Sequence, residues 1–450
     1  MPMGSSDRRA EREFWRLAWP ASAEGLIVTL LLAVNLLMVS GLGTSATSAV
    51  GISAQPRMLL LCVSRSFAVA VSALIATRYG QGKIDTLNSC LKQAFVVITA
   101  VSFLFLLLSL ALLEPILRLA GAKDDYMAMA LDYGKPAMAS LFFLSLSTIL
   151  NAGLLGIGRT RAIMVASVAG NLCSAVLGGA LIYGWGPLSP LGVAGAGMGA
   201  LAGAFLSFLI TLAVLLDPQC TVTLRGRFGW RLRREELSAL RQIFTGAFAE
   251  QGVERAGMFL SSRMTAELGT LPFAVHTICM NLCDLYYSFA QGMGKASLVF
   301  AGQSLGAGNP RAFSETARAG RRIGFFLSAA ACIAYALFRI PLITVYESST
   351  EALSLGGEIM LFVAVVSFPE AHAHICAGTL RGAGKTRFVA VYSLISIAVL
   401  RPILTWAFCF PLGLGLHGAW AALLLDQTIR AVCASAGVFR VGRALKSNKL

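Results

Sequence analysis

The sequence predicts an all-α polytopic membrane protein with twelve transmembrane helices in two six-helix bundles. Hydrophobic residues make up 56% of the 450 residues and charged residues only 13%, whereas a soluble protein carries about 25% charged residues. Apolar runs long enough to cross a hydrocarbon core of about 30 Å as helices recur along the whole chain. The second half of the chain also repeats the first, which predicts a duplicated six-helix unit.

The apolar runs predict the individual spans, because a helix satisfies its own backbone groups in lipid. In the first half we expect spans near 17–39, 48–76, 93–113, 127–154, 160–183 and 192–216. In the second half we expect them near 240–265, 271–301, 323–340, 355–378, 388–410 and 416–438. No A-x-A-like cleavage site follows the first apolar run, which argues against a removed secretory signal.

The distribution of charge predicts the orientation of these spans. The net charge is +15, and most of the basic residues lie at the two termini and in alternate connections between spans. The opposite connections hold Arg118 and Lys123 together with several acids. Because cytoplasmic loops are rich in Lys and Arg, we expect an inner (plasma) membrane protein with both termini in the cytoplasm. The same rule explains the net charge without a nucleic-acid partner.

A single offset of 226 positions relates several short matches between the two halves. They are Ala23-Glu24 with Ala249-Glu250, Leu42-Gly43-Thr44 with Leu268-Gly269-Thr270, Gly80 and Gly82 with Gly306 and Gly308, Pro115 with Pro341, and Gly156 to Arg161 with Gly382 to Arg387. Six spans per repeat return the chain to the same side of the membrane, so we expect a pseudo-two-fold axis along the membrane normal. The predicted lobes are 1–216 and 240–450, joined by a basic cytoplasmic linker at 217–239.

The chain contains no complete motif of a soluble enzyme. Gly384-Lys385-Thr386 resembles the end of a phosphate-binding loop, but that pattern needs a glycine where Thr379 stands. The ten cysteines have no metal-site spacing, and His372 and His374 lie on nearly opposite faces of a helix, which favours a hydrogen-bonding role for one of them. We therefore expect no enzyme, no cofactor and no ATP site.

Acidic residues inside predicted spans are the strongest functional signal. Glu250 and Glu254 lie one turn apart in the seventh span, Asp284 lies in the eighth, and Glu370 follows Pro369 in the tenth. A charged residue in the middle of a span costs roughly 2.5–3.5 kcal/mol and indicates a functional site by default. Such a carboxylate can exchange a proton or hold Na⁺. The competing interpretation is structural pairing with bases of the same half, for which the candidates are Arg255, Arg263, Lys295 and Arg401.

Four segments have a family-specific pattern, namely VNLLMVSGLGTSA (34–46), GPLSPLGVAGAGMGA (186–200), LGAGNPRA (305–312) and TLRGAGKTR (379–387). Through these segments nearly the whole chain resembles the multidrug and toxic compound extrusion (MATE) family. The resemblance implies that Glu254 and Glu370 occupy the acidic positions of the family's seventh and tenth helices and carry the coupling ion. The chain departs from the family at Asn35, where many bacterial members have an aspartate, so we expect coupling in the C-terminal lobe.

The predicted function is efflux of a small organic, cationic or amphipathic substrate by cation-coupled antiport with alternating access. The candidate ion-coupling and substrate-binding residues are Glu254, Glu370, Glu250, Asp284 and Asn35, with H⁺ or Na⁺ as the coupling ion. We expect a monomer whose partners are the substrate and the lipid bilayer. Basic residues also lie inside the predicted spans, so the sequence is compatible with an anionic substrate as well. The alternative function is that of a flippase for lipid-linked saccharides, from the same superfamily.

Overall fold

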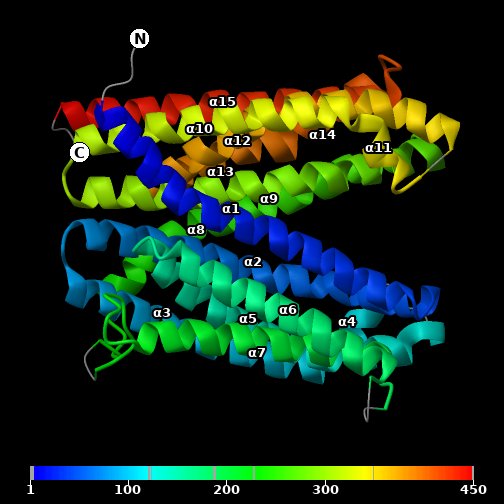
Figure 1. Ribbon diagram of the computed structural model, residues 1–450, viewed down its shortest axis with the longest axis horizontal. Coiled ribbons are helices and arrows are strands. Elements are labelled where there is room, and N and C mark those ends of the chain that lie inside the picture. Colours follow the sequence, from blue (N-terminus) through cyan, green and yellow to red (C-terminus); the bar gives the residue numbers. More distant parts are fainter. Residues whose placement is uncertain are drawn as a thin grey trace. The chain divides into compact units, whose positions relative to one another are not determined.

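The computed structural model describes residues 5–119, 122, 124–185, 189–226, 229–347 and 349–447 (Figure 1). Every regular element in these ranges is a helix. Of the residues named in the sequence analysis, Lys123 and positions 186–188 of the segment 186–200 lie outside the described residues.

The helices form two compact units. One unit holds Ala23–Phe244, and the other holds Met1–Ser22 together with Thr245–Leu450. The division falls inside two helices, α1 (Ser5–Ser40) and α8 (Arg234–Ala266). The beginning of each of these helices therefore packs in a different unit from the remainder of the same helix.

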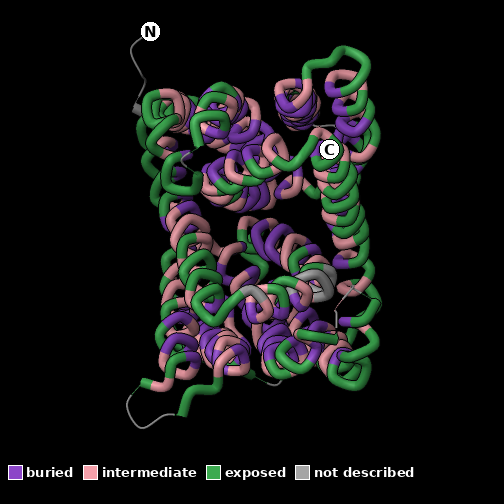
Figure 2. The backbone as a smooth tube through the Cα atoms, turned by 90° about the vertical axis from the view of Figure 1, so that its right-hand side faces the viewer, coloured by how far each residue is buried: buried purple, intermediate pink, exposed green. Residues whose placement is uncertain are grey.

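The N-terminal unit continues from α1 through six further helices, which are α2 (Thr44–Gly80), α3 (Ile84–Ala111), α4 (Leu113–Leu119), α5 (Asp124–Gly156), α6 (Thr160–Tyr183) and α7 (Val193–Leu216). Its closest helix pairs are α6 with α7, α2 with α5, and α5 with α7. The buried residues of this unit lie where its helices face one another, and exposed residues cover its outer side (Figure 2).

Glycines make the tightest of these pairings. A Cβ atom on Gly199 of α7 would overlap the backbone of Gly178 on α6, and one on Gly203 would overlap the backbone of Gly170. Small residues at such spacing let two helices approach closely in a membrane, where packing is a main source of association. The run of glycines near 195–203 therefore serves packing, as its GxxxG spacing predicts.

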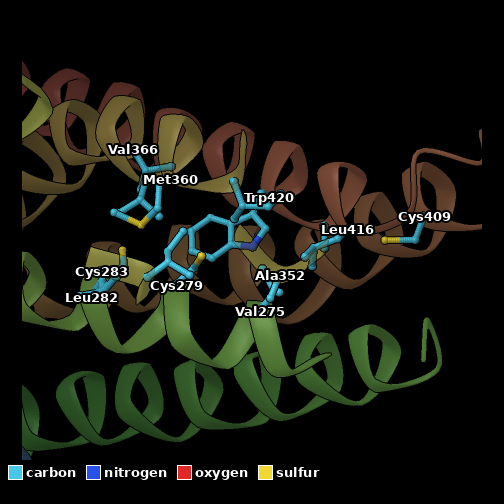
Figure 3. Packing of buried hydrophobic residues seen from close by; sticks show 14 residues of the cluster. Val275, Cys279, Leu282, Cys283, Ala352, Met360, Val366, Cys409, Leu416 and Trp420 are labelled. Atoms are coloured by element: carbon cyan, nitrogen blue, oxygen red, sulfur yellow. The ribbon is translucent and has the colours of Figure 1, made fainter. Parts of the chain in front are cut away.

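The C-terminal unit contains the larger part of α8 and the helices α9 (Thr270–Gly306), α10 (Pro310–Leu337), α11 (Arg339–Thr344), α12 (Thr350–Gly382), α13 (Thr386–Ser393), η1 (Leu394–Leu400), α14 (Arg401–Cys409) and α15 (Gly415–Lys446). One of its core clusters gathers around the fully buried Trp420 of α15 (Figure 3). Leu282 and Cys279 of α9 and Met360 of α12 pack in the same cluster (Figure 3).

The helix bounds repeat with the offset that the sequence shows. Moving α2, α3 and α5 forward by 226 positions gives the bounds of α9, α10 and α12, and moving α6 gives Thr386–Cys409, the span formed by α13, η1 and α14. The glycine before α2 and its counterpart before α9, Gly43 and Gly269, both have a positive φ, 104° and 111°. A side chain would strain this backbone, so the repeat preserves the glycines that start these helices.

Ten of the described helices or helix runs are long and apolar enough to cross a membrane. At the offset of 226, α8 and α9 are the counterparts of α1 and α2, so they count as spans too. The total is then the twelve spans that the sequence predicts. These two helices carry Glu250, Glu254, Arg255, Asp284 and Lys295, among other charges. Three of the five candidate residues thus lie on α8 and α9, whereas Glu370 lies on α12, which is one of the ten.

The eleventh span contains a π-helical segment, η1, that its counterpart α6 lacks. Pro402 follows this segment, and the backbone N–H of Arg401 reaches back to the carbonyl of Ser396. A proline has no N–H and its ring crowds the carbonyl four residues earlier, so the turn before it widens. The widened turn precedes Arg401, whose side chain forms a buried ion pair described below.

Candidate functional site

Buried and half-buried charged and polar side chains gather in the C-terminal unit from α8, α9, α12, α13, α14 and α15. They are Glu250 and Glu254 from α8, Tyr287 from α9, Glu370, His374 and Arg381 from α12, Tyr392 from α13, Arg401 from α14, and Asp426 and Arg430 from α15. Electrostatic interactions connect Glu370 with Glu254, Arg401 and Arg430, which makes this a single cluster.

Glu250 is held in a buried ion pair. Nε of Arg381 donates to its Oε2 over 3.2 Å, and Nη2 of the same arginine donates to its Oε1. The side chain of Glu250 is only 4% exposed. The partner is none of the four bases that the sequence suggests. The predicted tenth span ends at 378 and leaves Arg381 in a cytoplasmic connection, whereas α12 extends to Gly382 and includes it.

Glu254 accepts a hydrogen bond from a tyrosine instead. The hydroxyl of Tyr287 donates to Oε1 of Glu254 over 3.0 Å. The ring of Tyr287 meets the ring of His374 edge-on, with centroids 4.9 Å apart. A hydrogen bond from a phenol positions the carboxylate but supplies no counter-charge, so Glu254 keeps its formal charge when ionised.

Glu370 is the least satisfied acid of the cluster. It is 3% exposed, and its Oε2 has no hydrogen-bond partner among the described residues. Nε2 of His374, one helical turn further along α12, is also buried without a partner in the part of the chain that the structure describes. Buried polar atoms are nearly always satisfied, so an unsatisfied carboxylate oxygen indicates a place where a proton or another ligand binds.

The other two predicted site residues lie in different surroundings. Asp284 of α9 is exposed, and it interacts electrostatically with Arg255 and with the buried Glu370. Asn35 of α1 is half-buried and belongs to the N-terminal unit. Four of the five predicted residues therefore share one unit, and three of them share the cluster.

Sequence reasoning missed five members of the cluster, Tyr287, Arg381, Tyr392, Asp426 and Arg430, and the last two form a pattern on one helix. Asp426 is fully buried, and its Oδ2 accepts from Nε of Arg401 over 2.9 Å. Arg430 is 4% exposed and lies one helical turn further along α15. Their spacing of four residues inside the last apolar span was the available signal, because opposite charges at this spacing share one helix face.

No group of described residues has the composition of a metal site with three or more His, Cys, Asp or Glu ligands. His372, on the opposite side of α12 from His374, shares a 2.7 Å hydrogen bond with Ser435. One of the two histidines thus has the hydrogen-bonding role that their spacing favours.

The N-terminal unit lacks the counterparts of these charges. At the offset of 226, Glu254 corresponds to Val28, Glu370 to Leu144, Arg381 to Leu155 and Arg430 to Ala204. Only Glu250 has an acidic counterpart, Glu24, which accepts a hydrogen bond of 2.9 Å from Ser167. The duplicated fold therefore carries its charged cluster in one repeat.

The comparison with known families decides the identity. The MatE family model matches residues 20–179 and, a second time, residues 247–407. The chain belongs to the MatE family. The two matches fall on the two repeats, so each repeat is a MatE unit, and the predicted resemblance to the multidrug and toxic compound extrusion transporters is confirmed.

Individual MatE relatives match along most of their length. "Probable multidrug resistance protein NorM" of Rhizobium meliloti (strain 1021) is 25% identical over 426 residues, which cover 92% of this chain and 91% of that protein. A solved "outward-facing conformation of a multidrug resistance MATE family transporter of the MOP superfamily" has a TM-score of 0.91 at 20% identity and covers 99% of this chain and 100% of the solved chain.

A solved MOP superfamily transporter from Pyrococcus furiosus, described as having a binding pocket of reverse polarity, has a TM-score of 0.89 and 20% identity. It covers 99% of this chain and 100% of the solved one. These matches confirm the predicted all-α, multi-pass membrane fold. The chain is a membrane transporter of the MatE family.

Proposed function

We propose that this chain is a secondary-active exporter that couples substrate efflux to the entry of a cation through Glu254 and Glu370. The observation that carries the proposal is the buried Oε2 of Glu370, which has no partner among the described residues. Neither Glu254 nor Glu370 forms an ion pair within the described part of the chain, in contrast to Glu250 and Asp426. Both acids are thus available to a mobile cation.

The physical basis of coupling is the cost of an uncompensated charge away from water. A buried carboxylate is expensive unless a proton, a metal ion or a cationic ligand neutralises it. The coupling cation and a cationic substrate then compete for the same negative charge. When the site opens first to one side of the membrane and then to the other, this competition becomes antiport.

The proposed substrates are small organic, cationic or amphipathic compounds. The relatives named as multidrug resistance proteins support efflux of such compounds. The solved transporter described as having a pocket of reverse polarity supports testing anionic compounds as substrates too. We further propose an inner-membrane location with both termini in the cytoplasm, which fluorescence of a C-terminal green fluorescent protein fusion would test.

The test is efflux from proteoliposomes that hold ethidium, under an imposed pH gradient and then under a Na⁺ gradient. Glu254→Gln and Glu370→Gln should each abolish gradient-driven efflux while leaving the protein folded in the membrane. Glu358→Gln is the matched control, because Glu358 lies on α12 like Glu370 but is 60% exposed and pairs with His417. Full transport by both variants would remove the proposed mechanism.

A further inference from the structure

Arg57 is a cation in the N-terminal unit that the proposed function does not use. It lies on α2, inside the second predicted span, and is half-buried. Its Nη1 donates a hydrogen bond of 2.8 Å to the hydroxyl of Tyr133 on α5. Its Nε is buried and has no hydrogen-bond partner in the described part of the chain. Buried polar atoms are nearly always satisfied, so this N–H indicates a missing acceptor.

The open edge of Arg57 is the edge with which two arginines of the C-terminal unit hold carboxylates. Arg381 donates from Nε and Nη2 to Glu250, and Arg401 donates from the same two nitrogens to Asp426. This edge presents two N–H groups whose spacing matches the two oxygens of a carboxylate. In Arg57 neither of these nitrogens donates to a residue that the structure describes.

Acids of the chain do not fill this place within the described ranges. The ion-paired acids of the N-terminal unit contact Arg78 or Arg118, and none of them contacts Arg57. Asp132 directly precedes Tyr133 on α5 but is exposed. The hydroxyl of Tyr133 accepts from Arg57, and its own O–H has no acceptor among the same residues. The two side chains thus offer only donors and one positive charge.

The other repeat shows that packing does not require these polar groups. At the offset of 226, Arg57 corresponds to Cys283 and Tyr133 to Ile359. Both counterparts are buried in the apolar core cluster around Trp420 (Figure 3). An apolar pair therefore fills this position in the same fold, whereas a charge inside a span is costly and marks a functional site by default. The cost of Arg57 indicates a ligand of opposite charge.

We propose that Arg57 and Tyr133 bind the carboxylate of a small organic substrate in the N-terminal unit. The inference rests on the proposed function and extends its substrates to compounds that carry a carboxylate. Nε and Nη2 of Arg57 donate to the two oxygens of that group, and the O–H of Tyr133 donates to one of them. The negative charge of the ligand balances the guanidinium, which cannot lose its own charge in a protein.

A matched pair of dyes tests the carboxylate directly. Rhodamine B carries a free benzoate, and its methyl ester differs in that group alone. Wild-type proteoliposomes should export both dyes under the gradient that drives ethidium efflux. Arg57→Met should lower the export of rhodamine B by about tenfold or more, because a bidentate contact between charged groups is lost. It should leave the export of the ester and of ethidium unchanged.

The matched control is Arg65→Met, which removes a positive charge from an exposed position of the same helix. This variant should export both rhodamine dyes at the wild-type rate. A general effect of charge on α2 would instead appear in both variants and for both dyes.

Three further variants separate ligand binding from a structural contact. Arg57→Lys keeps the charge but not the planar pair of N–H groups, so the affinity for rhodamine B, measured by fluorescence polarisation, should recover only in part. Tyr133→Phe keeps the ring and should weaken rhodamine B binding by about fivefold through the lost hydrogen bond. Arg57→Cys/Tyr133→Ile copies the other repeat. It should keep the wild-type size-exclusion profile and ethidium efflux but lose rhodamine B binding.

A displacement measurement needs no variant. Benzoate should displace rhodamine B from the purified wild-type protein, because it presents the same carboxylate on a small ring. Benzamide has nearly the same shape and no charge, so it should not displace the dye at the same concentration.

Four results would overturn the inference. They are wild-type export of rhodamine B by a folded Arg57→Met protein, equal loss of both rhodamine dyes in that protein, displacement by benzamide as strong as by benzoate, and a wild-type protein that exports ethidium but not rhodamine B. All four leave the proposed function standing, because ethidium carries no carboxylate. A wild-type protein that exports no ethidium under either gradient would instead contradict the proposed function.

Discussion

Arg381 holds Glu250 with two nitrogens at once, Nε to Oε2 and Nη2 to Oε1, although the two residues are 131 positions apart. The pair joins the end of α12 to the middle of α8 and is buried on the glutamate side. Removing one partner of a buried pair costs about 3–5 kcal/mol, because the other charge stays without compensation.

Arg381→Met should therefore destabilise the purified protein by about this amount, with an unfolding temperature lower than that of the wild type. The measurement is thermal unfolding in detergent followed by tryptophan fluorescence. His417→Gln is the control, since it breaks the more exposed pair with Glu358 and should leave the transition unchanged. Equal transitions for all three proteins would contradict a structural role of the pair.

Tyr287→Phe should weaken efflux without unfolding the protein. The change removes the hydrogen bond to Glu254 and keeps the ring that packs on His374. A hydrogen bond to a charged group contributes about 1.5–3 kcal/mol, so efflux of ethidium should fall by about tenfold or more. Tyr335→Phe, which removes a bond to the backbone carbonyl of Leu282, should keep wild-type efflux.

Gly203→Leu should prevent α6 and α7 from packing. The side chain would occupy the position of the Gly170 carbonyl and of Ser174, and backbone atoms cannot move aside as a flexible side chain can. We expect little folded protein on size-exclusion chromatography. Gly51→Ala in α2 meets no atom within 4 Å and should express normally; a folded Gly203→Leu protein would show that the two helices can separate.

Lys92→Met should release the linker that follows α7. Nζ of Lys92 donates to the backbone carbonyls of Arg225, over 2.6 Å, and Gly226, over 3.2 Å, and lies above the ring of Trp230. Without this charge the segment near Arg225 should open more often, and limited trypsin digestion there should be faster. Lys83→Met, at an exposed position, should be cleaved at the wild-type rate. Identical rates for both variants would show that other contacts hold the linker.

The sequence by itself determined the helices and their duplication. Long apolar runs fix the spans, because lipid leaves the backbone no partner outside its own helix, and glycines with positive φ fix where α2 and α9 begin. Both signals are local, so the offset of 226 reappears as matching helix bounds in α2 and α9 and in α5 and α12. The costly placement of acids such as Glu254 and Glu370 was visible in the same way, as an exception to the apolar pattern.

Only the tertiary structure decided which charges compensate one another. Glu250 pairs with Arg381 and not with Arg255, which is closer in sequence, and Arg401 pairs with Asp426. Oε2 of Glu370 has no partner among the residues that the structure describes. These outcomes depend on distances of a few ångströms between side chains on different helices, since electrostatic energy in a poorly screened interior falls with separation. Helical periodicity places a residue on a face of its own helix, but the packing of helices determines what that face meets.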